Sequence, residues 1–227
     1  MVFFSTRAVR DRAQAIPEGR FADMQDQGPR DGKGTSAAII RRRIETAMLE
    51  LSGGLGYRAV TLELLLARSG GTAEQFQADF ADLGACFAAA YEAEAEDLCA
   101  AMLTAAGEAG DWRPATEAAL TTVLRFATAR PQIARALVRE VHIAGGTALA
   151  KHEELLERLA GAMGEECKAT QSDLAVPRAP SFVVGAVEGV IAGHLDRGEE
   201  RQLLAAAPEL MDLITTFFVG RESQGDK

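Results

Sequence analysis

Residues 56–80 read GYRAVTLELLLARSGGTAEQFQADF, a stretch that predicts two short helices joined by a tight turn. Leu62, Leu65 and Leu66 recur at helical spacing, so they form one apolar face of the first helix. Ser69-Gly70-Gly71 then ends that helix, because glycine adopts a left-handed backbone without a Cβ penalty. A helix, a glycine turn and a second short helix are typical of the helix-turn-helix motif.

The second helix of this motif carries its own start signal. Thr72 and Gln75 have the S/T-x-x-E/Q spacing of a capping box, in which each side chain satisfies a backbone N–H of the other residue. Phe76 and Phe80 lie four residues apart and therefore share one helix face. The sequence thus predicts a capped recognition helix with a buried aromatic side.

The composition of the whole chain favours an all-α protein. Of its 227 residues 48% are hydrophobic, alanine and leucine are abundant, and no stretch alternates as a strand does. The chain has three cysteines, Cys86, Cys99 and Cys167, which are too few and too widely spaced for a disulfide framework or a zinc site. We therefore expect reduced thiols in a cytoplasmic protein, and we find neither a signal peptide nor an apolar run long enough to span a membrane.

Charge is distributed unevenly along the chain, whose net charge is −9. Residues 1–83 carry 11 basic and 11 acidic side chains, whereas residues 84–227 carry 13 basic and 22 acidic ones. The whole deficit therefore lies in the later part. Because nucleic acids are negatively charged, only the N-terminal end can bind one.

Residues 1–35 are rich in Gly, Pro, Asp, Gln and Arg without a steady apolar period, which predicts an extended or partly disordered arm. Its six basic residues would allow it to follow a DNA groove, whereas its five interleaved acids suit a solvated tail. Thr35 or Ser36 then begins a helix in which Arg41, Arg42 and Arg43 spread over more than half the circumference. At least one of these arginines should face outward, either to contact a phosphate or to remain solvated.

The stretch from Arg43 to Phe80 resembles, without a gap, the DNA-binding domain of the TetR/AcrR family of bacterial transcriptional regulators. The resemblance rests on these positions: Arg43, Ile44, Ala47, Leu49, Glu50, Leu51, Gly56, Tyr57, Ala59, Thr61, Arg68, Gly70, Thr72, Phe76 and Phe80. It implies a three-helix DNA-binding domain over residues 36–83 and a helical domain for ligand binding and dimerisation over residues 84–222. It also implies a homodimer that binds a palindromic operator in double-stranded DNA and responds to a small-molecule effector.

The exposed positions of the recognition helix depart from the family pattern. Gln77 and Asp79 stand where the family often has aromatic or histidine side chains, and Glu74 lies near the helix start. Residues 36–83 carry five arginines and six acids, so we expect weaker or more selective DNA binding than in the family. The residues predicted to contact DNA are Arg41, Arg42, Arg43, Thr61, Thr72, Ala73, Glu74, Gln75 and Gln77.

The helices after residue 84 supply the candidates for an apolar ligand pocket: Phe87, Tyr91, Met102, Trp112, Phe126, His142, Phe182 and Glu188. Each of them also suits an ordinary core position. Glu188 is the strongest candidate, because a carboxylate inside an apolar run is costly to bury unless it meets a cation, a ligand or a neighbouring subunit.

Two late helices are candidates for the dimer interface, since the family pairs its final two helices in a four-helix bundle. Glycines at every fourth position form a stripe that lets another helix approach closely, from a second subunit or from the same one. The predicted interface residues are Gly185, Gly189, Gly193, Leu210, Ile214 and Phe217.

No catalytic, dinucleotide-binding or phosphate-binding motif occurs, and none of the three histidines has a ligand partner nearby in the sequence. We therefore predict no enzyme activity, no cofactor and no metal site. The expected function is a ligand-responsive transcriptional regulator, a repressor released by a small hydrophobic molecule. The alternative is a binding module of the same fold that has lost DNA affinity and acts through a ligand or protein partner.

Overall fold

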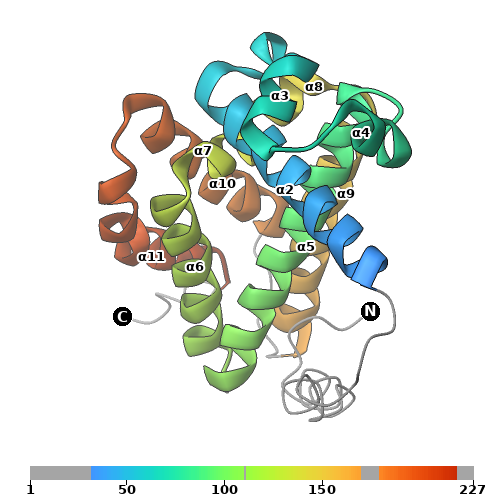
Figure 1. Cartoon of the computed structure of the whole chain (residues 1–227). Coiled ribbons are helices and arrows are strands. Elements are labelled where there is room, and N and C mark those ends of the chain that lie inside the picture. The colour runs from blue at the N-terminus through green and yellow to red at the C-terminus, as the bar shows by residue number, and fades with distance from the viewer. Residues whose placement is uncertain (1–31, 110, 170–178, 219–227) are drawn as a thin grey trace, which may run out of the picture.

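The computed structural model describes residues 32–109, 111–169 and 179–218, and within those ranges it contains helices and no strand (Figure 1). The all-α prediction is confirmed. Most of the arm predicted over residues 1–35 lies outside the described residues. No helix within these ranges is both long and apolar enough to cross a membrane.

The N-terminal part of the chain forms a compact head, at the top of Figure 1. Its elements are α2 (Gly32–Leu55), a 3-10 turn η2 (Tyr57–Ala59), α3 (Leu62–Ser69) and α4 (Ala73–Asp79). The first helix begins at Gly32, a few residues before the predicted start at Thr35 or Ser36. Residues 32–35 contain no proline that would interrupt the backbone hydrogen bonds there. The predicted turn is correct: Gly70 has φ 68° and caps α3.

The body consists of the helices that follow: α5 (Leu83–Ala109), α6 (Trp112–Ala129), α7 (Pro131–Arg135), the π-helical segment η3 (Ala136–Glu140), α8 (Val141–Ala144), α9 (Gly146–Ala169), α10 (Ala179–Arg197), the 3-10 segment η4 (Glu200–Ala206) and α11 (Ala207–Phe218). Pro208 is the second residue of α11, where a helix tolerates the missing backbone N–H of proline. The sequence predicts a single helix over residues 131–145, whereas the structure inserts a π turn into it.

One continuous core joins the head to the upper body. Ile44 and Phe76 from the head pack in the same buried cluster as Phe87, Tyr91 and Ile133 from the body. A second cluster fills the body between α6, α10, η4 and α11. The head is therefore packed against the body rather than joined to it only by a linker, and this packing sets its orientation.

Helices α2 and α7 touch backbone to backbone at Gly53. A Cβ built on Gly53 would lie 1.7 Å from the carbonyl oxygen of Gln132, so only glycine fits at this crossing. Glycines usually weaken a helix, but Gly53 is buried at this crossing. Gly53 permits close approach between the head and the body, and Gly54 is exposed beside it.

Candidate functional site

The helix-turn-helix is built by local capping. The Thr61 side chain accepts a hydrogen bond from the Leu64 backbone N–H and begins α3. Thr72 and Gln75 form the full predicted capping box at the start of α4. Phe76 and Phe80 are buried, with ring centroids 5.4 Å apart. The recognition helix is thus held by its cap and its aromatic side, and its other side is exposed.

The exposed side of α4 is acidic and amide-rich. Glu74, Gln77 and Asp79 are exposed, whereas Ala73 and Gln75 are half-buried. Gln75 accepts the Thr72 N–H through its side-chain oxygen, so its carbonyl is committed to the cap rather than free for a base. The pKa of Glu74 is lowered, first by its own backbone N–H and then by Thr72, which keeps a negative charge on this face.

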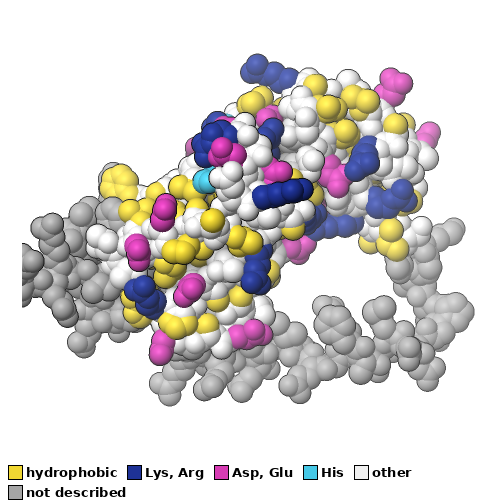
Figure 2. All heavy atoms as spheres, turned by 90° about the vertical axis from the view of Figure 1, so that its left-hand side faces the viewer, with side chains coloured by type: hydrophobic (Ala, Val, Ile, Leu, Met, Phe, Trp, Pro, Cys, Tyr) yellow, Lys and Arg dark blue, Asp and Glu magenta, His cyan; other side chains and the backbone are white. Residues whose placement is uncertain are grey.

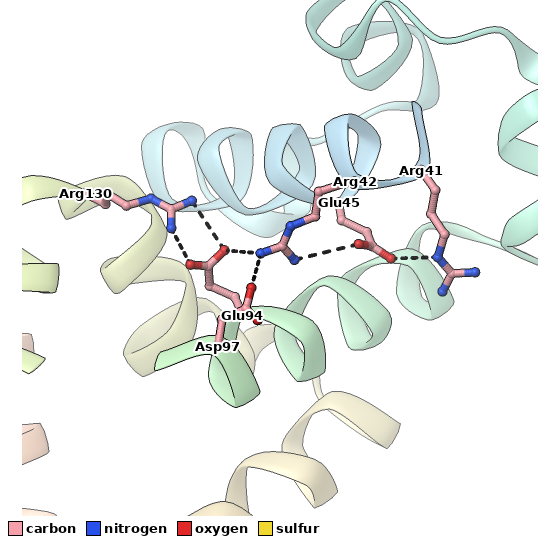
Figure 3. A network of polar contacts seen from close by, with 6 residues as sticks. All are labelled: Arg41, Arg42, Glu45, Glu94, Asp97 and Arg130. Atoms are coloured by element: carbon pink, nitrogen blue, oxygen red, sulfur yellow. Dashed lines mark hydrogen bonds and ion pairs between the residues drawn. The ribbon is translucent and has the colours of Figure 1, made fainter. Parts of the chain in front are cut away.

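Arg42 belongs to a network that ties the head to the body (Figure 3). Its guanidinium lies 2.6 Å from Asp97 and 3.4 Å from Glu94. Glu94 is 2% exposed and also binds Arg130 at the C-terminal end of α6. The sequence predicts Arg42 as a phosphate contact, whereas in the structure its guanidinium pairs with acidic side chains of the body.

Arg41 and Arg43 differ from Arg42 and from each other. Arg41 pairs with Glu45 at 3.0 Å and with Asp79 at 3.5 Å, so it neutralises part of the recognition helix. Arg43 is exposed, and its guanidinium lies against the turn, 2.7 Å from a Cβ built on Gly70. No ion pair among the described residues involves Arg43. Arg43 is therefore the arginine of this triplet that is exposed and has no ion pair among the described residues.

Figure 2 shows the side of the molecule that lies at the left in Figure 1, where α6, α10 and α11 are labelled. Lys and Arg side chains are interspersed with Asp and Glu side chains over this face, and hydrophobic side chains lie between them. The face shown therefore has a mixed charge.

The body encloses an apolar cavity of about 200 Å³ between α5, α6, the α7–η3 segment, α9, α10 and α11. This volume is far above the roughly 10–15 Å³ that a single water needs. Five residues predicted for a ligand pocket line the cavity: Tyr91, Met102, Trp112, Phe126 and Glu188. The remaining walls are mainly leucine, valine and alanine side chains, so the cavity suits an apolar molecule.

Three residues predicted for the pocket do not line this cavity. Phe87 is fully buried in the core between head and body, where its ring meets Tyr57 edge to face. Phe182 is 60% exposed on the outer side of α10, because its helix turns that position away from the body. His142 is exposed on α8, and its ring lies 5.1 Å from that of His152.

His152 is the pocket residue that the sequence interpretation missed. It is 3% exposed, its Nδ1 lies 2.9 Å from the Tyr91 hydroxyl, and its Nε2 lies 3.0 Å from a carboxylate oxygen of Glu188. Burial is the main reason that the pKa of Tyr91 is raised, and the charge of Glu188 adds to it. The helical spacing of His152 with Leu155, Leu156 and Leu159 was the available signal that it faces inward.

The α7–η3 segment connects the cavity with the head. Leu137 and Val138 line the cavity. Two residues later, the buried carboxylate of Glu140 accepts the backbone N–H of Tyr57 at 2.7 Å. A π turn shifts the register of the residues after it, and such turns are frequent at functional sites.

The predicted dimer residues fall into two groups. Gly185 and Gly189 are exposed on α10, and no atom of the described chain lies within 4 Å of a Cβ built on either of them. A Cβ on Gly193 meets only the tip of Arg197. Leu210 and Ile214 are corrected: they are 4% and 3% exposed, because they face the core of their own subunit. The side chain of Phe217 lies outside the described residues.

No protein-family model matches the sequence, and no curated protein matches it significantly. Two solved structures are similar to the chain. The fatty acid degradation regulator FadR from Bacillus halodurans has a TM-score of 0.69 and 13% identity, covering 77% of this chain and 97% of that one. A TetR family transcription regulator from Marinobacter aquaeolei VT8 has a TM-score of 0.64 and 15% identity, covering 79% and 97%. The chain has the fold of TetR-type regulators, as residues 43–80 predicted.

Proposed function

We propose that the chain is a ligand-responsive transcription regulator that binds DNA as a homodimer. It acts as a repressor, and a small hydrophobic molecule releases it from DNA. The observation that carries the proposal is the capped helix-turn-helix, with an exposed recognition helix, packed on a body that encloses an apolar cavity. Both neighbours in fold are named as regulators, which supports the same role here.

DNA binding rests on few contacts in this proposal. Arg43 at the turn contacts a phosphate, and Gln77 on the exposed side of α4 reads a base edge, for which a glutamine pairs best with adenine. The Glu74 carboxylate accepts a hydrogen bond from a cytosine amino group, and its negative charge repels the DNA phosphates. Thr61, Thr72 and Ala73 flank the turn and fix the register.

Release follows from a population shift between two head orientations. A ligand in the cavity contacts Leu137 and Val138, and the same segment holds the head at Gly53 through Gln132 and at Tyr57 through Glu140. A ligand that displaces this segment therefore favours a spacing of the two recognition helices that does not match successive major grooves, about 34 Å apart.

The second subunit packs on α10 in this proposal. Gly185 and Gly189 offer a surface without side chains and without a described neighbour, and Phe182 lies on the same side of the helix at i−3 of Gly185. Close approach of a second α10 at these glycines would bury the exposed Phe182 ring.

The test of DNA binding is selection of the full-length protein against random duplex DNA, followed by salt titration. We expect an enriched palindrome. Arg43→Ala should weaken binding to all sequences and reduce the log–log salt slope by about 0.9 for each phosphate that is no longer neutralised. Arg201→Ala is the matched control, because Arg201 is an exposed arginine of the body. Absence of an enriched sequence would refute the regulator proposal.

The test of ligand response uses the apolar fluorophore N-phenyl-1-naphthylamine, displaced by saturated fatty acids of increasing length. We expect the displacing acid to weaken DNA binding, and DNA to weaken acid binding by the same factor, because coupling between sites is reciprocal. Glu140→Gln should reduce that factor. Equal factors in Glu140→Gln and the native protein would refute the proposed route.

A second function has one observation in its favour. Residues 36–83 carry a net charge of −1, and Arg42 is committed to the body. If the chain is instead a module that binds its ligand but no DNA, we expect the selection to enrich no sequence while the fluorophore still binds in the cavity.

A further inference from the structure

Three helices bring nitrogen and oxygen donors to one point beside the cavity. His142 from α8, His152 from α9 and Glu188 from α10 each place one ligand atom within 4.8 Å of the others. In the sequence these residues are 10 and 36 positions apart, so no local motif announces them. We infer that His142, His152 and Glu188 form a binding site for a divalent transition metal ion.

The strongest observation is a pair of buried atoms without hydrogen-bond partners. Nε2 of His152 and Oε1 of Glu188 are both inaccessible to solvent and neither makes a hydrogen bond within the described chain. They lie 3.0 Å apart, yet their orientation does not satisfy hydrogen-bond geometry. Buried polar atoms without partners are costly, and a cation bound by both lone pairs removes that cost.

The other nitrogen of His152 is already held. Nδ1 lies 2.9 Å from the Tyr91 hydroxyl, whose oxygen accepts a hydrogen bond from Nδ1–H in the tautomer in which Nε2 presents its lone pair. Histidines that bind metals usually donate their second N–H to such a partner, which fixes both the tautomer and the ring orientation. Tyr91 is itself buried, at 2% exposure, so it acts as a rigid support.

The size and chemistry of the site select the ion. Metal–nitrogen and metal–oxygen bonds of about 2.0–2.2 Å place neighbouring ligand atoms of a zinc site roughly 3.3 Å apart, close to the separation of Nε2 and Oε1. His142 is exposed, so its side chain is free to close on the ion and leaves a path of entry from solvent. Two imidazoles and one carboxylate favour Zn²⁺ or a neighbouring first-row metal over Mg²⁺ or Ca²⁺, which prefer oxygen donors.

A metal here would link α8, α9 and α10, and α8 directly follows the segment that holds the head. The site does not depend on the proposed function: its existence is decided by metal binding alone, whether or not the protein binds DNA.

The experiment is titration of the full-length, EDTA-treated and dialysed protein with Zn²⁺ against a chromophoric indicator, and with Co²⁺ followed by its d–d absorption. We expect one ion per chain, a cobalt spectrum of a site with nitrogen and oxygen donors, and a melting temperature that rises with Zn²⁺ concentration. His142→Ala should weaken zinc binding at least tenfold. Because His142 is exposed, this variant is expected to fold. Glu188→Gln should likewise weaken zinc binding.

His194→Ala is the matched control. His194 is the remaining histidine of the chain; its Nδ1 lies 2.9 Å from the carbonyl oxygen of Val190, and it is not in the cluster. The control should bind like the native protein, and so should the double variant Cys99→Ser and Cys167→Ser, which removes two thiols. Failure of the native protein to bind one ion, or equal binding by His142→Ala and His194→Ala, would overturn the inference. Mg²⁺ binding as tight as Zn²⁺ binding would overturn it as well.

Discussion

Replacing Gly53 with alanine tests whether the head is held by close packing on α7. The added Cβ would lie 1.7 Å from the Gln132 carbonyl oxygen, whereas ordinary van der Waals contact begins at 3.4 Å, so the two backbones must move apart. No side-chain rotation relieves a clash between a Cβ and a backbone oxygen. The helices must therefore move apart at a seam where Leu49 and Ile133 are buried, at 1% and 2% exposure.

The cost follows from overpacking and from the surface that is opened. Overpacked core positions are destabilised by about 1–3 kcal/mol, and exposing on the order of 100 Å² of apolar surface costs about 2.5 kcal/mol. We expect Gly53→Ala to lower the free energy of unfolding by about 2–3 kcal/mol. For a chain of this length that corresponds to a fall of about 4–12 °C in melting temperature.

Gly54→Ala is the control, because it adds the same methyl group one residue later in the same helix. Its Cβ would meet only the Gln132 side chain at 3.9 Å, which is ordinary contact. Alanine is favoured over glycine in a helix by about 0.5–1 kcal/mol, so this variant should melt at or slightly above the native temperature. Thermal melting by circular dichroism measures both variants. Equal melting temperatures for Gly53→Ala and Gly54→Ala would refute the reasoning.

Three further variants test other parts of the structure. Glu94→Gln removes the buried negative charge between two half-exposed arginines and should lower the free energy of unfolding in urea by about 1–2 kcal/mol; an unchanged free energy would show that the network is not stabilising. Burial raises the pKa of the Cys86 thiol to about 12, so the unfolded chain ionises first and stability should fall as pH rises from about 9 towards 12. Cys86→Ala should lessen that slope; an unchanged slope contradicts the assignment. Gly189→Arg should give a monomer in light scattering if α10 forms the dimer interface, and an unaffected dimer would place the interface elsewhere.

The sequence by itself determined the elements whose causes are local. The capping box of Thr72 and Gln75, the left-handed Gly70 and the aromatic pair of α4 all act within a few residues, so spacing was sufficient to predict them. The helical class followed from composition for the same reason, since propensity and periodicity act residue by residue.

Only the tertiary structure decided which side chains are available for function. Arg41, Arg42 and Arg43 look equivalent in sequence, yet Arg42 meets Glu94 and Asp97, which are 52 and 55 residues away, and only Arg43 stays exposed without a described ion pair. Such partners come from other helices, and their approach depends on how the helices cross rather than on local spacing.

The cavity and the histidine cluster show the same division. Periodicity placed Tyr91, Met102 and Phe126 on inward faces, and they line the cavity. It could not show that Phe182 turns outward, or that His142 and His152 meet Glu188, because three separate helices create that point. Helix positions follow from local chemistry, whereas long-range contacts are decided by the way the whole core packs.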